Sequence, residues 1–327
     1  MKRIFSHQRF FISLFTGVFL FLIIALSNES PAYWFEFWWM LPIAFVISLS
    51  VNIIGISSAA LFVPFFILIF PFFSDSLSHI ESITIGLITE AFGLTSSALA
   101  FLAFGLTDKR MALYATAGLL PFLVLGVLMV SIVPESILLL MIAGLLMISV
   151  FFIFFEERLV KHRNIPHVGK QINTCENGEE QVTLTTKDKH TYIYCRTYRG
   201  HIKRFFGYGV GGFFQGAVGF GAGELGIVSM MLSRIPIRVA IGTSHLIVAL
   251  SAICASVIHL LVSFGGEGVV DMHWNIVAWT LPAVIIAGQI SPYVASRLPT
   301  KVLERFMAIL FTGIAIALLV LAVQNGH

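Results

Sequence analysis

The chain has 327 residues, of which 57% are hydrophobic and only 11% are charged, with a formal net charge of +3. This composition excludes an ordinary soluble domain. The 20 Lys and Arg residues are spread along the chain rather than gathered into one basic face, which argues against a nucleic-acid partner. We interpret the chain as an all-α integral membrane protein embedded in a lipid bilayer.

Apolar runs of membrane-spanning length recur along the sequence. A helix needs about 20 apolar residues to cross the hydrocarbon core. Two apolar segments, 38–72 and 207–232, are interrupted by glycine, serine or proline. Seven uninterrupted runs lie near 10–27, 82–104, 111–131, 136–155, 239–264, 275–296 and 303–323.

The first run follows the basic residues Lys2, Arg3 and Arg9. A basic start, an apolar core and small residues near Ser27 are also typical of a secretory signal peptide. The run is long for a signal core, so we favour an uncleaved N-terminal helix. Both interpretations remain open at this point, and N-terminal sequencing of the mature protein distinguishes them.

The basic residues set the expected orientation, because cytoplasmic loops carry an excess of Lys and Arg. With a cytoplasmic N-terminus and two interrupted segments that enter and leave on one face, all 20 Lys and Arg residues fall inside. A single crossing by either segment would move the long basic loop or Lys109 and Arg110 outside. The charges therefore favour two re-entrant hairpins. The outer side then receives only acids, namely Glu29, Glu36, Asp75, Glu81, Glu135, Glu267 and Asp271.

Self-similarity predicts a duplication. Asn52–Gly55 aligns with Val218–Gly221, and prolines and Ile-Gly pairs further on align at similar offsets. Each copy contains a helical hairpin followed by three crossings, and this odd number makes the copies inverted repeats. The predicted units are 1–37 (N-terminal helix and outer loop), 38–155 (first repeat), 156–204 (cytosolic linker) and 205–327 (second repeat).

The linker is the one substantial polar stretch. Alternating residues at 181–186 and 190–195, separated by Lys-Asp-Lys, predict a short β-hairpin. We expect a solvated connection, with a regulatory module as the alternative. The spacing of Cys175, Cys195 and Cys254 indicates neither a metal site nor a disulfide framework. No motif for a cofactor is found.

Two segments of the second copy carry a recognisable pattern: 216–224 (GAVGFGAGE) and 235–244 (IPIRVAIGTS). This pattern resembles the TauE/SafE family of sulfite and organosulfonate exporters. The resemblance implies anion transport across a bacterial plasma membrane, with the hairpins of both repeats meeting at a central site. The sequence departs from the family at Glu224 and at 229–231, where members usually carry small residues and a proline. The substrate therefore stays open.

The hairpin tips are the candidate substrate site. With no Lys or Arg expected inside the bilayer, the available anion donors are backbone N–H groups at helix N-termini. The second arm of each hairpin begins at its tip, which points these groups at the membrane centre. The alternative is that the glycines only allow tight helix packing. The candidate residues are Gly55, Ser57, Ser58, Gly221, Ala222 and Gly223.

Three further residues are candidates for proton coupling. Glu224 is an acid in an apolar segment, where a carboxylate is costly. It either satisfies amides of its own helix or carries a proton. His245 and Glu90 are candidate relay partners, each with a structural alternative. Thr243, Ser244 and Gln289 complete the predicted substrate site, although such polar residues also serve as contacts between helices.

We therefore expect a secondary transporter of a small anion, with export as the simpler direction. An anion channel and an intramembrane enzyme are the alternatives, and the apolar spans contain no GxSxG or HExxH motif. The expected location is the plasma membrane. The oligomeric state is open, and a homodimer is one expectation.

Overall fold

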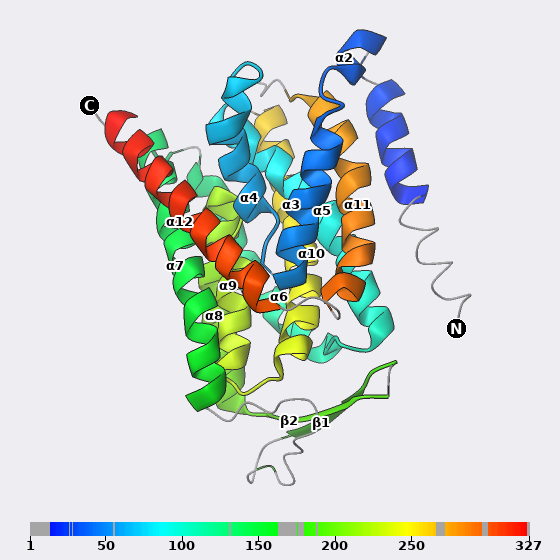
Figure 1. The fold of residues 1–327 in the computed structure, drawn as a ribbon, viewed down its shortest axis with the longest axis vertical. Coiled ribbons are helices and arrows are strands. Elements are labelled where there is room, and N and C mark those ends of the chain that lie inside the picture. The colour runs from blue at the N-terminus through cyan, green and yellow to red at the C-terminus, as the bar shows by residue number, and fades with distance from the viewer. Residues whose placement is uncertain are drawn as a thin grey trace.

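The computed structural model describes residues 14–25, 27, 29–54, 56–130, 132–162, 175, 180–187, 189–265, 272–295 and 300–325. These residues form a helical bundle with a two-stranded sheet at one end (Figure 1). Within the described part of the chain, six helical stretches are long and apolar enough to cross a membrane. They are Pro31–Ile53, His79–Phe104, Lys109–Val130, Ile237–Val262, Trp274–Ser291 and Met307–Gln324.

This set differs from the seven predicted crossings, because it lacks the runs at 10–27 and 136–155 and gains Pro31–Ile53. The apolar part of the run at 136–155 is the shorter stretch Glu135–Phe151. The described part of the first apolar run is the short helix Leu14–Ala25. Helix α2 (Pro31–Phe35) and α3 (Met40–Ile54) are joined by turns over 36–39, so they form one apolar stretch of spanning length. The indole Nε1 of Trp279 donates to the Trp34 carbonyl oxygen at 2.6 Å, which holds α2 against α11 (Trp274–Ala295).

The first interrupted segment folds back on itself. After α3 the chain continues into α4 (Ala59–Pro64), the π-helix η1 (Phe65–Ile69) and the 3₁₀ turn η2 (Phe70–Phe72). The ring centroids of Phe37 and Phe70 lie 5.3 Å apart, so the turn before α3 and the start of η2 are neighbours. The reversal lies between α3 and α4, in the middle of the bundle (Figure 1).

Three long helices follow: α5 (His79–Phe104), α6 (Lys109–Val130) and α7 (Glu135–His162). The Ser78 hydroxyl caps α5 by accepting from the Glu81 backbone N–H at 3.1 Å. Gly105 ends the helix with φ of 77°, a left-handed conformation. Helix α7 continues into the region that the sequence assigned to the linker.

The linker contains strands β1 (Glu180–Thr185) and β2 (Thr191–Arg196). They pair antiparallel, with Val182 opposite Tyr194, and lie across one end of the bundle (Figure 1). Cys175 and Cys195 form a disulfide. The expectation of no disulfide from the cysteine spacing was therefore wrong, because the hairpin brings together two residues that are 20 positions apart.

The second half begins with α8 (Tyr198–Val218) and α9 (Ala222–Met231). Gly207 packs against Ser229 and Gly211 against Ala222, so these two helices run antiparallel. Helix α8 begins before residue 205, because its first turns carry basic side chains that can extend to the polar surface. The remaining helices are α10 (Ile237–Gly265), α11 (Trp274–Ala295) and α12 (Thr300–Asn325).

Helix packing pairs elements from the two halves. Helices α5 and α10 pack together, as do α7 and α12. Helix α6 packs along α8, and α11 packs along α3. The first two contacts each join corresponding helices of the two predicted copies. The α6–α8 contact corresponds to the α11–α3 contact when the two copies are exchanged.

Candidate functional site

The two chain reversals meet in the buried centre of the protein. The backbone N–H of Ser57, just before α4, donates to Glu224 Oε1 at 3.2 Å. Ser57 is 1% exposed and Glu224 is 5% exposed. Ser57 and Glu224 are far apart in sequence, so this contact joins the first interrupted segment to the second. A backbone amide here holds a carboxyl group away from solvent.

Glycine makes the second reversal possible. Gly221, which precedes α9, has φ of 127°, a conformation that residues with side chains rarely adopt. A Cβ atom at Gly211 on α8 would lie 2.7 Å from the Ala222 Cα, closer than atoms can pack. The arms therefore approach each other to backbone contact, and the first turn of α9 sits inside the bundle.

A buried polar network surrounds the Ser57–Glu224 contact. The Ser57 hydroxyl donates to Glu90 Oε1, and Gln215 Nε2 donates to Glu90 Oε2 at 3.4 Å. The Ser251 hydroxyl donates to Gln215 Oε1 at 2.6 Å. Glu90, Gln215 and Ser251 are fully buried. Helices α5, α8 and α10 thus each contribute one side chain to the network.

Several polar atoms at this place have no hydrogen-bond partner among the described residues. They are the Ser58 hydroxyl, Glu224 Oε2 and Asn52 Oδ1. A buried polar group without a partner costs about 1 to 3 kcal/mol. Such atoms next to a free helix start are suited to bind a small polar ligand.

The structure brings only part of the predicted site together. Ser57, Ser58, Glu224 and Glu90 lie at the meeting point. Gly221 to Gly223 form the turn and first residues of α9, and Ala222 is fully buried. Gly55 lies outside the described residues.

Thr243, Ser244 and His245 are not brought to the reversals. The Thr243 hydroxyl accepts from the Asp108 backbone N–H at 3.0 Å, at the loop between α5 and α6. Ser244 lies close to the Tyr208 hydroxyl on α8. The His245 ring packs on Phe101, with ring centroids 4.9 Å apart. These residues occupy the first turns of α10, near the end of the bundle.

His245 is therefore not next to Glu90, the other predicted relay partner of Glu224. Phe101 and Glu90 are separated along α5 by about 16 Å at 1.5 Å per residue. Gln289 is also displaced from the reversals. Its Nε2 donates to the Ser96 carbonyl oxygen at 2.9 Å, and this contact joins α11 to α5. Gln289 thus makes a contact between helices, which was the alternative to a place in the substrate site.

Sequence reasoning missed Ser251. It lies on the apolar helix α10 and bonds to Gln215, whose neighbour in the network is Glu90. The one sequence feature that could have indicated a role for Ser251 is its hydroxyl group in the middle of an apolar run of membrane-spanning length. Such residues often bond to their own helix, so the signal does not specify a partner.

A family model described as Sulfite exporter TauE/SafE matches residues 40–318 of the chain. The match covers both interrupted segments and the helices that follow each of them. No curated protein and no solved structure matches the chain.

Proposed function

Because this chain belongs to the sulfite exporter TauE/SafE family, we propose that it exports sulfite or a related small organosulfur anion, such as sulfoacetate, across the plasma membrane. The chain is a multi-pass membrane protein of a transporter family. An inside-negative potential favours anion exit by about 2.3 kcal/mol per charge per 100 mV. A dianion such as sulfoacetate still carries one net negative charge when one proton accompanies it, so the potential favours its export, whereas uptake would work against the potential.

The transport cycle is alternating access between two inverted repeats. Each repeat contributes a re-entrant hairpin, α3–α4 or α8–α9, followed by three helices. The helix packing supports this symmetry: α6 of the first repeat packs on α8 of the second, and α11 of the second repeat packs on α3 of the first. The hairpins start from opposite ends of the bundle (Figure 1). Movement of one repeat against the other opens the site to each side in turn.

The substrate is bound at the two hairpin tips. The observation that carries this proposal is the Ser57 N–H donating to the buried Glu224 carboxyl group. A carboxylate and a sulfite or sulfonate group are both oxyanions that accept from backbone amides at helix starts. In the observed state Glu224 occupies the amide that the substrate uses. Ser58 supplies a further donor, since its buried hydroxyl has no partner among the described residues.

Protonation of Glu224 frees the amide for the substrate. A carboxylate at this depth is costly, and Glu90, a second buried acid, also bonds to Ser57. With two acids at one serine, an arriving anion would place a third negative charge in the same site. We propose that a proton bound on Glu224 accompanies the anion, and that Glu90 and the Ser57 hydroxyl hold the tip in place.

The test is efflux of radiolabelled sulfite from proteoliposomes that contain the Ser58→Ala variant. Removing a hydroxyl without a protein partner should leave thermal stability unchanged. Loss of a hydrogen bond to a charged ligand should raise the KM for sulfite by about tenfold. Ser256→Ala is the matched control, because that hydroxyl donates to the Ala252 carbonyl oxygen of its own helix.

Equal KM values for the two variants would remove Ser58 from the site. The dependence of the flux on sulfite concentration distinguishes a carrier from an anion channel. The flux through a carrier saturates at a low turnover, whereas the current through a channel follows the gradient. Saturation is the expected result.

A further inference from the structure

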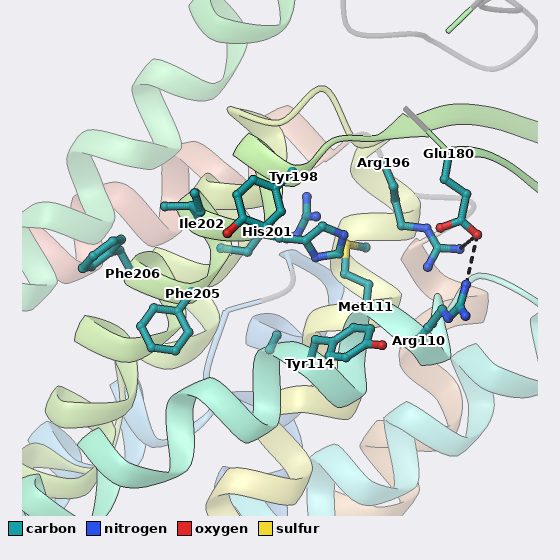
Figure 2. A pocket seen from close by; sticks show the side chains of 12 residues that line it. Arg110, Met111, Tyr114, Glu180, Arg196, Tyr198, His201, Ile202, Phe205 and Phe206 are labelled. Carbon is teal, nitrogen blue, oxygen red and sulfur yellow. Dashed lines mark hydrogen bonds and ion pairs between the residues drawn. The ribbon is translucent and has the colours of Figure 1, made fainter. Parts of the chain in front are cut away.

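A cavity lies away from the hairpin tips, at the end of the bundle that carries the β-hairpin. It has a volume of about 620 Å³ and lies between the first turns of α6, the ends of the two strands and the first turns of α8 (Figure 2). Nothing in the transport cycle proposed above uses this cavity.

One end of the cavity is positively charged. Arg110 Nη1 donates to Glu180 Oε1 at 3.1 Å, and Arg196 Nη2 lies 3.7 Å from the same oxygen (Figure 2). One exposed glutamate thus contacts two arginines. Arg204 also lines the cavity, so three arginines face one acid.

Asp108 does not neutralise this excess at the cavity wall. Its Oδ2 accepts from the Tyr194 hydroxyl at 2.6 Å, and its Oδ1 accepts from the Met111 backbone N–H at 3.1 Å. Burial, together with the charge of Asp108, raises the pKa of Tyr194, so this hydroxyl remains a donor. Asp108 lies 3.6 Å from Arg196 Nε, and its charge also acts on Arg204, although Arg204 Nη1 and Nη2 have no hydrogen-bond partner among the described residues.

Arg204 is the residue that indicates a ligand. It is 2% exposed, yet its Nη1 and Nη2 have no hydrogen-bond partner among the described residues. A buried guanidinium group without partners is costly, and its donors are arranged to bind a phosphate or carboxylate with two oxygens. Arg204 is one of the residues that line the cavity.

The other end of the cavity is apolar and open. Phe205, Phe206 and Ile202 gather there, and Phe206 is 62% exposed (Figure 2). Tyr198 and His201 lie between the apolar and the charged end (Figure 2). A ligand that fills this site therefore carries a negative head and an apolar tail.

We infer that this cavity binds the phosphate headgroup of an anionic phospholipid, with the acyl chains leaving over Phe205 and Phe206. The cavity lies at the end of the membrane-spanning helices, where headgroups meet the protein, and basic pockets between such helices hold anionic headgroups. Exposed aromatic side chains are typical of this level of the bilayer. A soluble phosphate ester would satisfy the arginines but not the apolar end.

The test measures thermal stabilisation of delipidated full-length protein in a neutral detergent. The probes are dioleoylphosphatidylglycerol, dioleoylphosphatidylcholine, glycerol 3-phosphate and inorganic phosphate. The variants are Arg204→Gln and, because a buried change can impair folding, the exposed Arg110→Gln. Lys203→Gln is the matched control: it removes one positive charge from the same turn of α8 but does not line the cavity.

We expect phosphatidylglycerol alone to stabilise the unaltered protein. Its apparent Kd should weaken by about tenfold in Arg204→Gln and by a smaller factor in Arg110→Gln, and stay unchanged in Lys203→Gln. Equal stabilisation by phosphatidylcholine, or an equal loss in Lys203→Gln, would overturn the inference. Equal stabilisation by glycerol 3-phosphate or inorganic phosphate would also overturn it, by identifying a site for soluble anions.

Discussion

The two hairpins have corresponding places in the fold but are held together by different means. The arms α8 and α9 pack through glycine, at backbone contact. The arms of the first hairpin are farther apart and are joined at their outer ends by aromatic rings, with Trp39 and Phe73 centroids 5.6 Å apart. The arms of the second hairpin are packed along their length, whereas the aromatic contacts of the first lie at its base.

The tips differ in chemistry as well. The first tip presents Ser57 and Ser58, which are donors, and the second presents Glu224, an acceptor. Two tips like the first would carry no carboxyl group of their own, although Glu90 would still bond to Ser57. In the proposed transport cycle, this difference provides the carboxyl group that exchanges with the substrate.

The largest effect is expected in the glycine-packed hairpin. Gly221→Val adds a Cβ atom 2.9 Å from the Phe214 Cβ and forces valine into a backbone conformation with positive φ. The overpacking and the strain together should cost about 3 kcal/mol or more. Thermal unfolding of the purified protein measures this loss.

Gly144→Val on α7 is the control, because no atom lies within 4 Å of the position a Cβ would take there. It should leave the melting temperature nearly unchanged. Equal effects at both positions would show that the close packing of α8 and α9 does not matter for stability.

A smaller effect is expected at the base of the first hairpin. Phe70 is fully buried against Phe37, so Phe70→Leu should lower stability by about 1.5 kcal/mol. Phe72, two residues on and 83% exposed, is the matched control for the same substitution. If Phe72→Leu were as damaging as Phe70→Leu in detergent, the aromatic contacts would not be what holds these arms.

The sequence predicted the broken segments well but not the contacts within the membrane. The predicted interrupted segment 38–72 corresponds closely to α3 and the run from α4 to η2, because glycine and serine mark the break between them. Residues such as Thr243 and Gln289 were placed at the tips from depth alone. In helices that are apolar all round, no polar stripe indicates which face a given residue occupies.

The disulfide was missed for a related reason. The pairing of Cys175 with Cys195 depends on the β-hairpin rather than on a spacing pattern. Likewise, the buried Arg204 looked like one more basic linker residue until α8 placed it in a cavity. Long-range contacts of this kind are set by the fold, and periodicity does not encode them.

The disulfide also gives the mildest test, since it concerns orientation rather than stability. The predicted orientation, drawn from the positions of Lys and Arg, puts the β-hairpin in the cytosol, where thiols are kept reduced. Under that prediction the pair that forms a disulfide in the structure is reduced in cells, and a membrane-permeant maleimide should label Cys175 and Cys195 in rapidly quenched cells without prior reduction. A disulfide in those cells would place the β-hairpin on the oxidising side and reverse the predicted topology.

The central claim is that the substrate and Glu224 share the Ser57 amide, so that an anion binds when Glu224 takes up a proton. Calorimetric titration of sulfoacetate in two buffers of different ionisation enthalpy measures this directly. The account predicts uptake of about one proton per anion at neutral pH, and tighter binding as the pH falls. In Glu224→Gln it predicts binding without proton uptake, while Glu36→Gln, at the outer end, behaves as the unaltered protein. Anion binding without proton uptake in the unaltered protein would contradict the account.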